Sequence, residues 1–312
     1  MKRIHSSLLI KSDGRIVRAG PILLAGLILP AGLILAAGLS FPCTARAQQS
    51  PQAQQTGRDR FLARFFAHNY AMTALEPSWP TPLVETDPRL TQYYRFAFSN
   101  EYTPSGTQTV NYGNNRGGGI VAWNRVQVDW LPPSYIQHNS SATDGFGDTS
   151  VLAKYRIASA NAEHGNYIVT AVLSHTFASS PHNGALTDSW TPTLAGGIGF
   201  LRHFDTESAL GGLLPTGRIA AQGRTIMWNS LVQDHVARPV FLEIENNATF
   251  YVGGSHDGRM QNFITPAAYY VYKKSDWKPQ HWFLVFAGGM QIATSQFHTY
   301  NHNTIAEMRI LF

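Results

Sequence analysis

Cysteine is nearly absent from this 312-residue chain, because the one cysteine, Cys43, lies in a leader-like N-terminal stretch. A mature protein without it cannot depend on disulfides, thiolate metal sites or a cysteine nucleophile. Charge is also scarce: Asp, Glu, Lys and Arg make up 14% of the residues, against about 25% in ordinary soluble domains. Helical periodicity is missing beyond residue 92, which excludes parallel βαβ folds.

The net charge of +5 belongs to the first 47 residues. Six basic residues and one acidic residue lie there, so the rest of the chain carries 18 basic and 18 acidic side chains. A neutral mature chain argues against a basic nucleic-acid-binding surface, and we expect no nucleic-acid partner.

The N-terminus has the three parts of a secretory signal peptide. Residues 1–20 are cationic, residues 21–39 form an apolar run, and Ala45-Arg46-Ala47 supplies a small-x-small cleavage pattern. We therefore predict a cleaved signal peptide over 1–47, which also removes Cys43. An uncleaved membrane anchor is the alternative, because the apolar run is long for a signal, although its Gly and Pro weaken a spanning helix.

Residues 48–90 are predicted to be a linker followed by a short amphipathic helix. The stretch 48–57 is rich in Gln, whereas 59–75 repeats aromatic and apolar residues at helical spacing opposite polar ones. Trp79-Pro80-Thr81-Pro82 ends the helix. The helix could lie on a membrane surface, plug a lumen or pack under a sheet, and the sequence leaves all three open.

From about residue 92 the hydrophobic period is two and remains so to the end. Clear examples are the segments 120–130, 149–157, 240–251 and 304–312. Their length suits strands that cross a membrane, which need about 9–11 residues. Clusters of Gly, Asn, Ser and Pro separate eleven or twelve such candidates.

Two features favour a membrane barrel over a soluble one. Aromatic residues fall near the ends of the segments, where they would form girdles at the membrane interfaces. The chain also ends on a strand pattern with Phe312, which resembles the C-terminal assembly signal of bacterial outer-membrane barrels. A soluble exported sandwich or lipocalin-like barrel remains the alternative.

We thus predict an all-β fold: a transmembrane antiparallel β-barrel over 91–312 with about 12 strands, 10 being possible. Short turns should face the periplasm and longer loops the outside, with 132–147 as the leading external loop. The predicted partners are outer-membrane lipid and, through Phe312, the barrel-assembly machinery.

Charged residues of the strands gather on the face opposite the apolar set, which in a membrane barrel is the lumen. The lumen-facing candidates are Arg125, Asp129, Lys154, Arg156, Glu243, Glu245, Glu307 and Arg309. A charge facing lipid costs about 2–4 kcal/mol at mid-depth. Because the set holds four charges of each sign, it either pairs into a closed network or lines a narrow pore of weak ion selectivity.

Catalytic and metal sites are weakly supported by the sequence. His175, Ser179, Ser180, His182 and Asn183 share one loop, and Ser255-His256-Asp257 lies in another, but neither carries an acyl-hydrolase motif. His298 and His302 sit four residues apart in a β-patterned stretch, about 13 Å when extended, too far to share one Zn²⁺. We expect no metal, no cofactor and no enzyme.

Several short pieces resemble one family of outer-membrane barrels, labelled "MetA-pathway of phenol degradation" and regarded as transporter-like. They are residues 144–149 leading into 152–156, then 214–217, 241–246, 264–266 and 275–277. The resemblance implies an outer-membrane barrel of about twelve strands and says little about the solute. We predict passive passage or binding of small, hydrophobic or neutral solutes. The alternatives are an outer-membrane hydrolase and a purely structural barrel.

Overall fold

The computed structural model describes residues 57–201, 203–237, 239–273 and 282–312. The predicted signal peptide and most of the Gln-rich linker lie outside the described residues, so both stay predictions.

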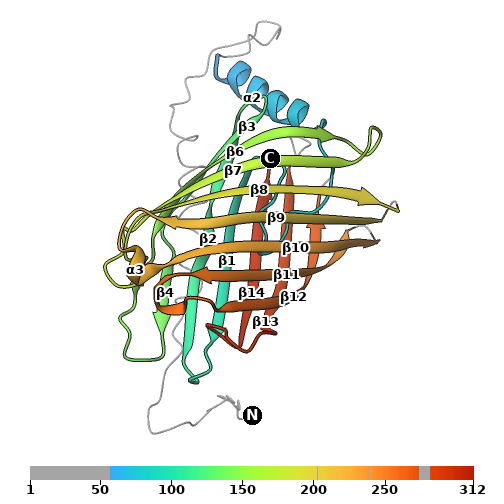
Figure 1. The fold of residues 1–312 in the computed structure, drawn as a ribbon. Helices are drawn as coiled ribbons and strands as arrows, with labels where there is room; N and C mark the ends of the chain where they lie inside the picture. The colour runs from blue at the N-terminus through green and yellow to red at the C-terminus, as the bar shows by residue number, and fades with distance from the viewer. Residues whose placement is uncertain (1–56, 202, 238, 274–281) are drawn as a thin grey trace, which may run out of the picture. The chain divides into compact units, whose positions relative to one another are not determined.

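From Tyr93 to the end, the chain forms one antiparallel sheet (Figure 1). Its strands are β1 (Tyr93–Tyr102), β2 (Gln108–Trp123), β3 (Val126–Leu131), β4 (Tyr135–His138), β5 (Gly145–Phe146), β6 (Thr149–Ala160), β7 (Tyr167–Phe177), β8 (Ser189–Phe200), β9 (Phe204–Pro215), β10 (Arg224–Ala237), β11 (Val240–Val252), β12 (Met260–Tyr272), β13 (Phe283–Ala293) and β14 (His302–Leu311). Two short helices, α3 (Ile219–Gln222) and η1 (Gly254–His256), lie in connections between strands.

The sheet closes on itself, because β1 pairs with both β2 and β14. The last strand is in register with the first from Tyr93↔Leu311 to Tyr102↔His302. β3 and β4 both pair with β2 and so occupy one position in the wall, while β5 pairs only with β4. The wall is therefore a closed barrel of twelve strands, and the predicted fold class is confirmed.

A pair of prolines separates β3 from β4. Pro132 and Pro133 lack the N–H that a strand ladder needs, so pairing stops at Leu131 and resumes at Tyr135. The predicted external loop 132–147 accordingly contains the β4–β5 hairpin, and only 139–144 forms its tip.

The two faces of the barrel differ in polarity along every strand. On the outside, large apolar side chains are exposed, among them Leu194 (54%), Ile244 (59%) and Leu210 (57%). Inward-pointing neighbours such as Glu243 and Glu245 are buried. Because lipid tolerates apolar side chains and excludes charge, this is the surface of a barrel that spans an outer membrane.

The predictions that 120–130 is one strand and that Arg125 faces the lumen are wrong. The structure splits that segment into β2 and β3, with a two-residue turn at Asn124 and Arg125, so Arg125 is exposed outside the lumen. In this hairpin Ile120 pairs with Val128. The two-residue turn alone would shift the alternation by one residue, because Trp123 faces Val126. The register shift between Val121 and Trp123 adds one residue to β2 and restores the phase. The hydrophobic pattern therefore hides the turn.

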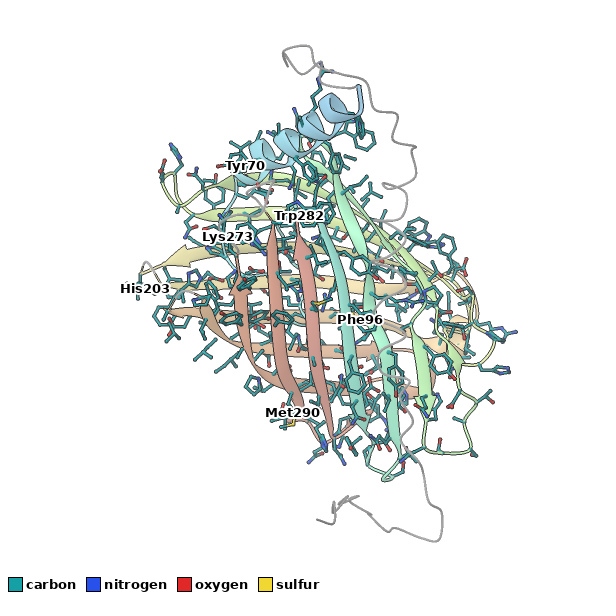
Figure 2. The ribbon with its side chains drawn as sticks, turned by 180° about the vertical axis from the view of Figure 1, so that it is seen from behind. Tyr70, Phe96, His203, Lys273, Trp282 and Met290 are labelled. Carbon is teal, nitrogen blue, oxygen red and sulfur yellow. The ribbon has the colours of Figure 1, made fainter. Side chains whose placement is uncertain are left out.

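The predicted N-terminal helix is present as α2 (Gly57–Thr73). It lies at the barrel end where the chain terminates: Asn69 Nδ2 donates to the Phe312 carbonyl at 2.5 Å, and the rings of Phe66 and Phe312 are 6.4 Å apart. Figure 2 shows Tyr70 of α2 at the same end as Lys273 and Trp282, with Met290 toward the other end. No described helix has the length and apolarity to cross a membrane.

We call the end that carries α2 and Phe312 the near end, and the opposite one the far end. The fully described near-end turns, 124–125 and 161–166, are short. Far-end connections include the longer 178–188, 216–223 and 294–301. Bacterial barrels place short turns in the periplasm, so we expect the near end to face the periplasm.

Candidate functional site: a segment held inside the barrel

After α2 the chain enters the barrel. Residues 76–92, called the inner segment from here on, contain no helix or strand, and most of them are buried. The segment contains four prolines, namely Pro77, Pro80, Pro82 and Pro88. Proline fixes an extended φ and supplies no N–H, so the segment cannot join the sheet as a strand. Its backbone groups must instead be satisfied by side chains of the wall.

Apolar side chains anchor the inner segment at two levels. Leu83 is 1% exposed and packs in a cluster of wall residues made of Ala267, Tyr269, Val285, Ala287 and Ile305. Trp79 lies against β8, where a Cβ on Gly197 would stand 2.8 Å from the indole ring. Only glycine leaves room for the ring there.

Three cationic side chains on one side of the lumen donate to carbonyls of the inner segment. We call Arg309 of β14, Arg95 of β1 and Lys154 of β6 the basic wall. Arg309 bonds the Thr81 carbonyl (2.8 Å) and the Pro82 carbonyl, Arg95 bonds the Leu83 carbonyl (2.7 Å), and Lys154 bonds the Asp87 (2.8 Å) and Arg89 (3.1 Å) carbonyls. Two uncharged side chains also donate hydrogen bonds: Gln233 to the Pro80 carbonyl (3.3 Å) and Thr170 to the Pro88 carbonyl (2.5 Å).

Four carboxyl groups line the other side of the lumen. We call Asp205 and Glu207 of β9, with Glu243 and Glu245 of β11, the acidic wall. Amides of the inner segment donate only to its β11 part: Leu83 N–H to Glu243 (3.3 Å), Val84 N–H to Glu245 (2.8 Å) and Glu85 N–H to Glu245 (3.0 Å).

The peptide groups between residues 81 and 85 therefore point across the lumen in the same direction. Their carbonyls face the basic wall and their amides face the acidic wall. Hydrogen bonds with one ionised partner are about twice as strong as neutral ones, and burial strengthens them further. The contacts are with the main chain, so they depend on an extended backbone more than on the identity of its side chains.

The remaining predicted lumen residues also lie inside. Arg156 pairs with Glu76 (2.5 Å) at the start of the inner segment, Asp129 accepts from the Tyr93 hydroxyl (2.9 Å), and Glu307 forms ion pairs with Arg95 and Arg309. Seven of the eight candidates thus lie in the lumen of the structure, and Arg125 does not.

Sequence reasoning missed Arg95, Asp205 and Glu207. Each alternates with outward or less buried neighbours, so the period-two signal was available. The lumenal path of the inner segment had no comparable signal, since prolines indicate an extended chain but not where it lies.

Two carboxyl groups of the inner segment itself have raised pKa values. Burial, together with the neighbouring charge of Glu245, raises the pKa of Glu85 to about 8. Burial also raises the pKa of Glu76 to about 7, although Arg156 opposes the shift. Both carboxyl groups therefore prefer the neutral form inside the barrel more than they would in water.

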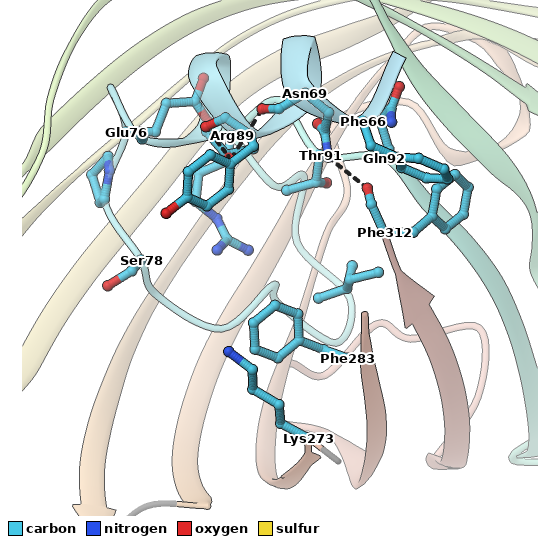
Figure 3. A pocket seen from close by; sticks show the side chains of 15 residues that line it. Phe66, Asn69, Glu76, Ser78, Arg89, Thr91, Gln92, Lys273, Phe283 and Phe312 are labelled. Carbon is cyan, nitrogen blue, oxygen red and sulfur yellow. Dashed lines mark hydrogen bonds between the residues drawn. The ribbon is translucent and has the colours of Figure 1, made fainter. Parts of the chain in front are cut away.

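Cavities flank the inner segment at the near end. One of about 670 Å³ lies between α2 and the barrel mouth, lined by aromatic rings with Arg89 and Lys273 (Figure 3). A second of about 760 Å³ shares Ser78, Arg89 and Lys273 with the first and extends along β12 and β13. Deeper inside, the space left between the inner segment and the basic wall is only about 170 Å³. Among the described residues, the inner segment thus lies between the wide near-end cavities and the small space beside the basic wall.

The residues considered for hydrolysis make structural contacts at the far end. The Ser180 hydroxyl donates to the Phe146 carbonyl (2.6 Å), while Asp148 accepts from the Ser180 and Ala185 amides. His256 packs on Tyr251 and Phe297. Among the hydrogen bonds of the described residues, none joins a serine hydroxyl to a histidine ring in either loop.

The two spaced histidines are likewise separate. His298 bonds the Ser295 carbonyl and Asn301 in a far-end connection, whereas His302 stacks on Tyr102 in the wall. Within the ranges that the structure describes, no group of three or more His, Cys, Asp or Glu residues is placed to hold a metal ion.

Solved structures with a similar overall form are outer-membrane barrels. The NanC porin shares 9% identity over 71% of this chain and 98% of its own, with a TM-score of 0.46. The COG4313 outer membrane channel from Pseudomonas putida F1 shares 13% over 75% and 100%, with a TM-score of 0.48. The translocator domain of the autotransporter NalP from Neisseria meningitidis shares 13% over 82% and 95%, at 0.39. No protein-family model matches the sequence, and no curated protein matches it.

Proposed function

We propose that this protein is an outer-membrane channel for passive passage of small solutes, and that the inner segment holds it closed. The observation that carries the proposal is the inner segment itself. Twelve strands enclose a lumen between a packed small barrel and an open porin, and here a separate stretch of chain, rather than wall side chains, fills the middle.

A purely structural barrel would have little need for such an arrangement. Wall side chains of opposite sign could pair across the lumen, yet the basic and acidic walls instead bind the two sides of the inner segment. The hydrolase alternative gains no support from Ser180 or Ser255, and the proposal assigns no catalytic residue.

We also propose a family for this chain and a role for its last residue in assembly. Membership in the "MetA-pathway of phenol degradation" barrels rests on the short pieces at 144–149 and 214–217, which fall at the start of β6 and the end of β9. Phe312 is proposed as the signal read by the assembly machinery, and lipid as the partner of the apolar outer face.

Conductance of the full-length mature chain in planar bilayers tests the channel. Leu83→Asp places a charge in the apolar cluster beside Glu243 and should drive the inner segment out, while it leaves the wall unchanged. We expect small or brief conductance from the wild type and a stable conductance, about ten-fold larger in open probability, from Leu83→Asp.

The matched control is Ala71→Asp, which adds the same charge at an exposed position of α2 and should behave as the wild type. Heat-modifiable gel migration shows that each variant is a folded barrel. Folded Leu83→Asp barrels that pass no current would exclude the channel and leave the structural barrel.

A further inference from the structure

The inner segment is held by a pattern of contacts that would suit other peptides. Of the wall contacts described above, those from Arg309, Arg95, Lys154, Gln233, Thr170, Glu243 and Glu245 all end on main-chain atoms of residues 80–89. Main-chain recognition with a few side-chain pockets is how proteins bind extended peptides of varied sequence.

From this geometry we infer that the lumen is a binding site for short, extended, proline-containing peptides, and that the inner segment is its built-in occupant. The inference rests on the proposed function and names the solute class of that channel. It replaces the hydrophobic or neutral solute expected from the sequence with a peptide.

The balance of donors and acceptors selects the peptide class. The barrel offers at least five donor side chains to carbonyls. Among the described residues it accepts fewer amides, at residues 83–85 from β11 and at Thr91 from Gln127 of β3. A peptide rich in proline presents carbonyls without the corresponding N–H groups and is already extended, so it loses little conformational entropy on binding. Peptides with an amide at every position would leave some N–H groups buried without partners.

Pockets for side chains exist at two places and are undemanding. The Leu83 site is a cluster of aliphatic residues and one tyrosine, which accepts any medium-sized apolar side chain. The Trp79 site depends on the absence of a side chain at Gly197. A ligand thus needs an extended backbone and one or two apolar residues.

Binding of fluorescent peptides to the full-length chain tests the inference without using conductance. The lumen is vacated by Leu83→Asp or, as a second variant, by Val84→Pro, which removes the amide bonded to Glu245. Three probes are compared: a copy of residues 77–91, the same peptide N-methylated at the Val84 and Glu85 amides, and an Ala-Pro repeat of equal length that carries Leu, Ala and Ala at the positions of Leu83, Val84 and Glu85.

We expect the copy to bind both variants and not the wild type, whose lumen is occupied. N-methylation should weaken binding about ten-fold or more, because two donors to Glu245 are lost. The Ala-Pro repeat should bind within about ten-fold of the copy, since it retains the carbonyls, the amides that Glu243 and Glu245 accept, and the leucine. The neutral aromatic p-cresol should not displace the bound copy.

Three results would overturn the inference: binding of the copy but not of the Ala-Pro repeat, equal binding of the N-methylated copy, or displacement by p-cresol. The first would show a dedicated plug, the second would show that the main chain is not read, and the third would restore the hydrophobic solute. Peptide binding by barrels that conduct nothing would remove the channel and leave the peptide site. A conducting barrel that binds no peptide would do the reverse.

Discussion

The basic and acidic walls of the lumen face the same peptide but are unequally engaged. Each member of the basic wall donates to at least one carbonyl of the inner segment, and Arg309 and Lys154 each reach two. On the acidic wall only the β11 pair receives amides. Both carboxylate oxygens of Glu207 are buried without a hydrogen-bond partner among the described residues.

Proline content explains the inequality. Each of the four prolines in the inner segment contributes a carbonyl and no N–H, so acceptors outnumber donors along the peptide. Every member of the basic wall therefore finds a carbonyl, whereas the acidic wall is left with carboxylate oxygens that have no hydrogen-bond partner among the described residues. The difference shows that the charge balance of a lumen does not reveal how its charges are used.

Arg309→Ala should weaken the binding of the inner segment to the basic wall and should have the largest effect on stability. It leaves the Thr81 and Pro82 carbonyls without donors and Glu307 with Arg95 as its remaining partner. Removing one partner from a buried charged network costs about 3–5 kcal/mol. The free energy of unfolding from vesicles in urea should fall by that amount, and Arg309→Lys should recover part of it. An unchanged free energy would mean that the inner segment does not rest on this wall.

Glu245→Ala should break the acidic wall by a smaller amount. The amides of Val84 and Glu85 lose their acceptor, which costs about 2 kcal/mol for buried donors. Open probability should rise in bilayers because the inner segment is held less tightly. Glu163→Ala, which removes a carboxylate exposed in a near-end turn, is the control and should change neither quantity. Closure as tight as in the wild type would exclude Glu245 as an anchor.

The sequence predicted the walls better than it predicted what lies between them. Strict alternation placed Lys154, Glu243 and Arg309 inside, because lipid excludes charge from the other face. The same signal did not reveal the turn at Arg125, because the bulge between Val121 and Trp123 offsets the phase shift of the two-residue turn.

The path of the inner segment depends on long-range contacts that no local pattern encodes. Leu83 bonds and packs against residues about 160 positions away, such as Glu243. The prolines predict an extended chain, and the pattern over 59–75 predicts a helix. Neither shows that the extended chain enters the lumen while the helix stays at its mouth, because that arrangement depends on the closed barrel.

Rising pH should weaken the binding of the inner segment inside the barrel, because Glu85 ionises. Its pKa is about 8 inside the barrel and takes the ordinary value of 4.5 when the inner segment leaves. An acid with a raised pKa stabilises the bound state fully below the lower value, and that stabilisation is lost as pH rises toward the higher one. Open probability should therefore increase between about pH 4.5 and 8.

Glu85→Gln cannot ionise and should flatten this pH profile while it keeps the channel closed. Glu76, whose pKa is raised to about 7, contributes in the same direction, so a residual slope below pH 7 is expected in the variant. A profile identical to that of the wild type would exclude Glu85 as the main titrating group.

Glu207→Gln should have the smallest effect and the opposite sign. Because neither carboxyl oxygen has a hydrogen-bond partner among the described residues, the substitution removes a buried ionisable group and breaks no hydrogen bond seen in the structure. Stability in urea should stay level or rise by about 1 kcal/mol. Glu243→Gln is the matched comparison on the same wall: its carboxylate accepts from Tyr269, Gln233 and the Leu83 amide, so that variant should lose stability. If Glu207→Gln instead lowered stability more than Glu243→Gln, the Glu207 carboxyl group would have a stabilising partner. The two walls would then not differ in how fully they are used.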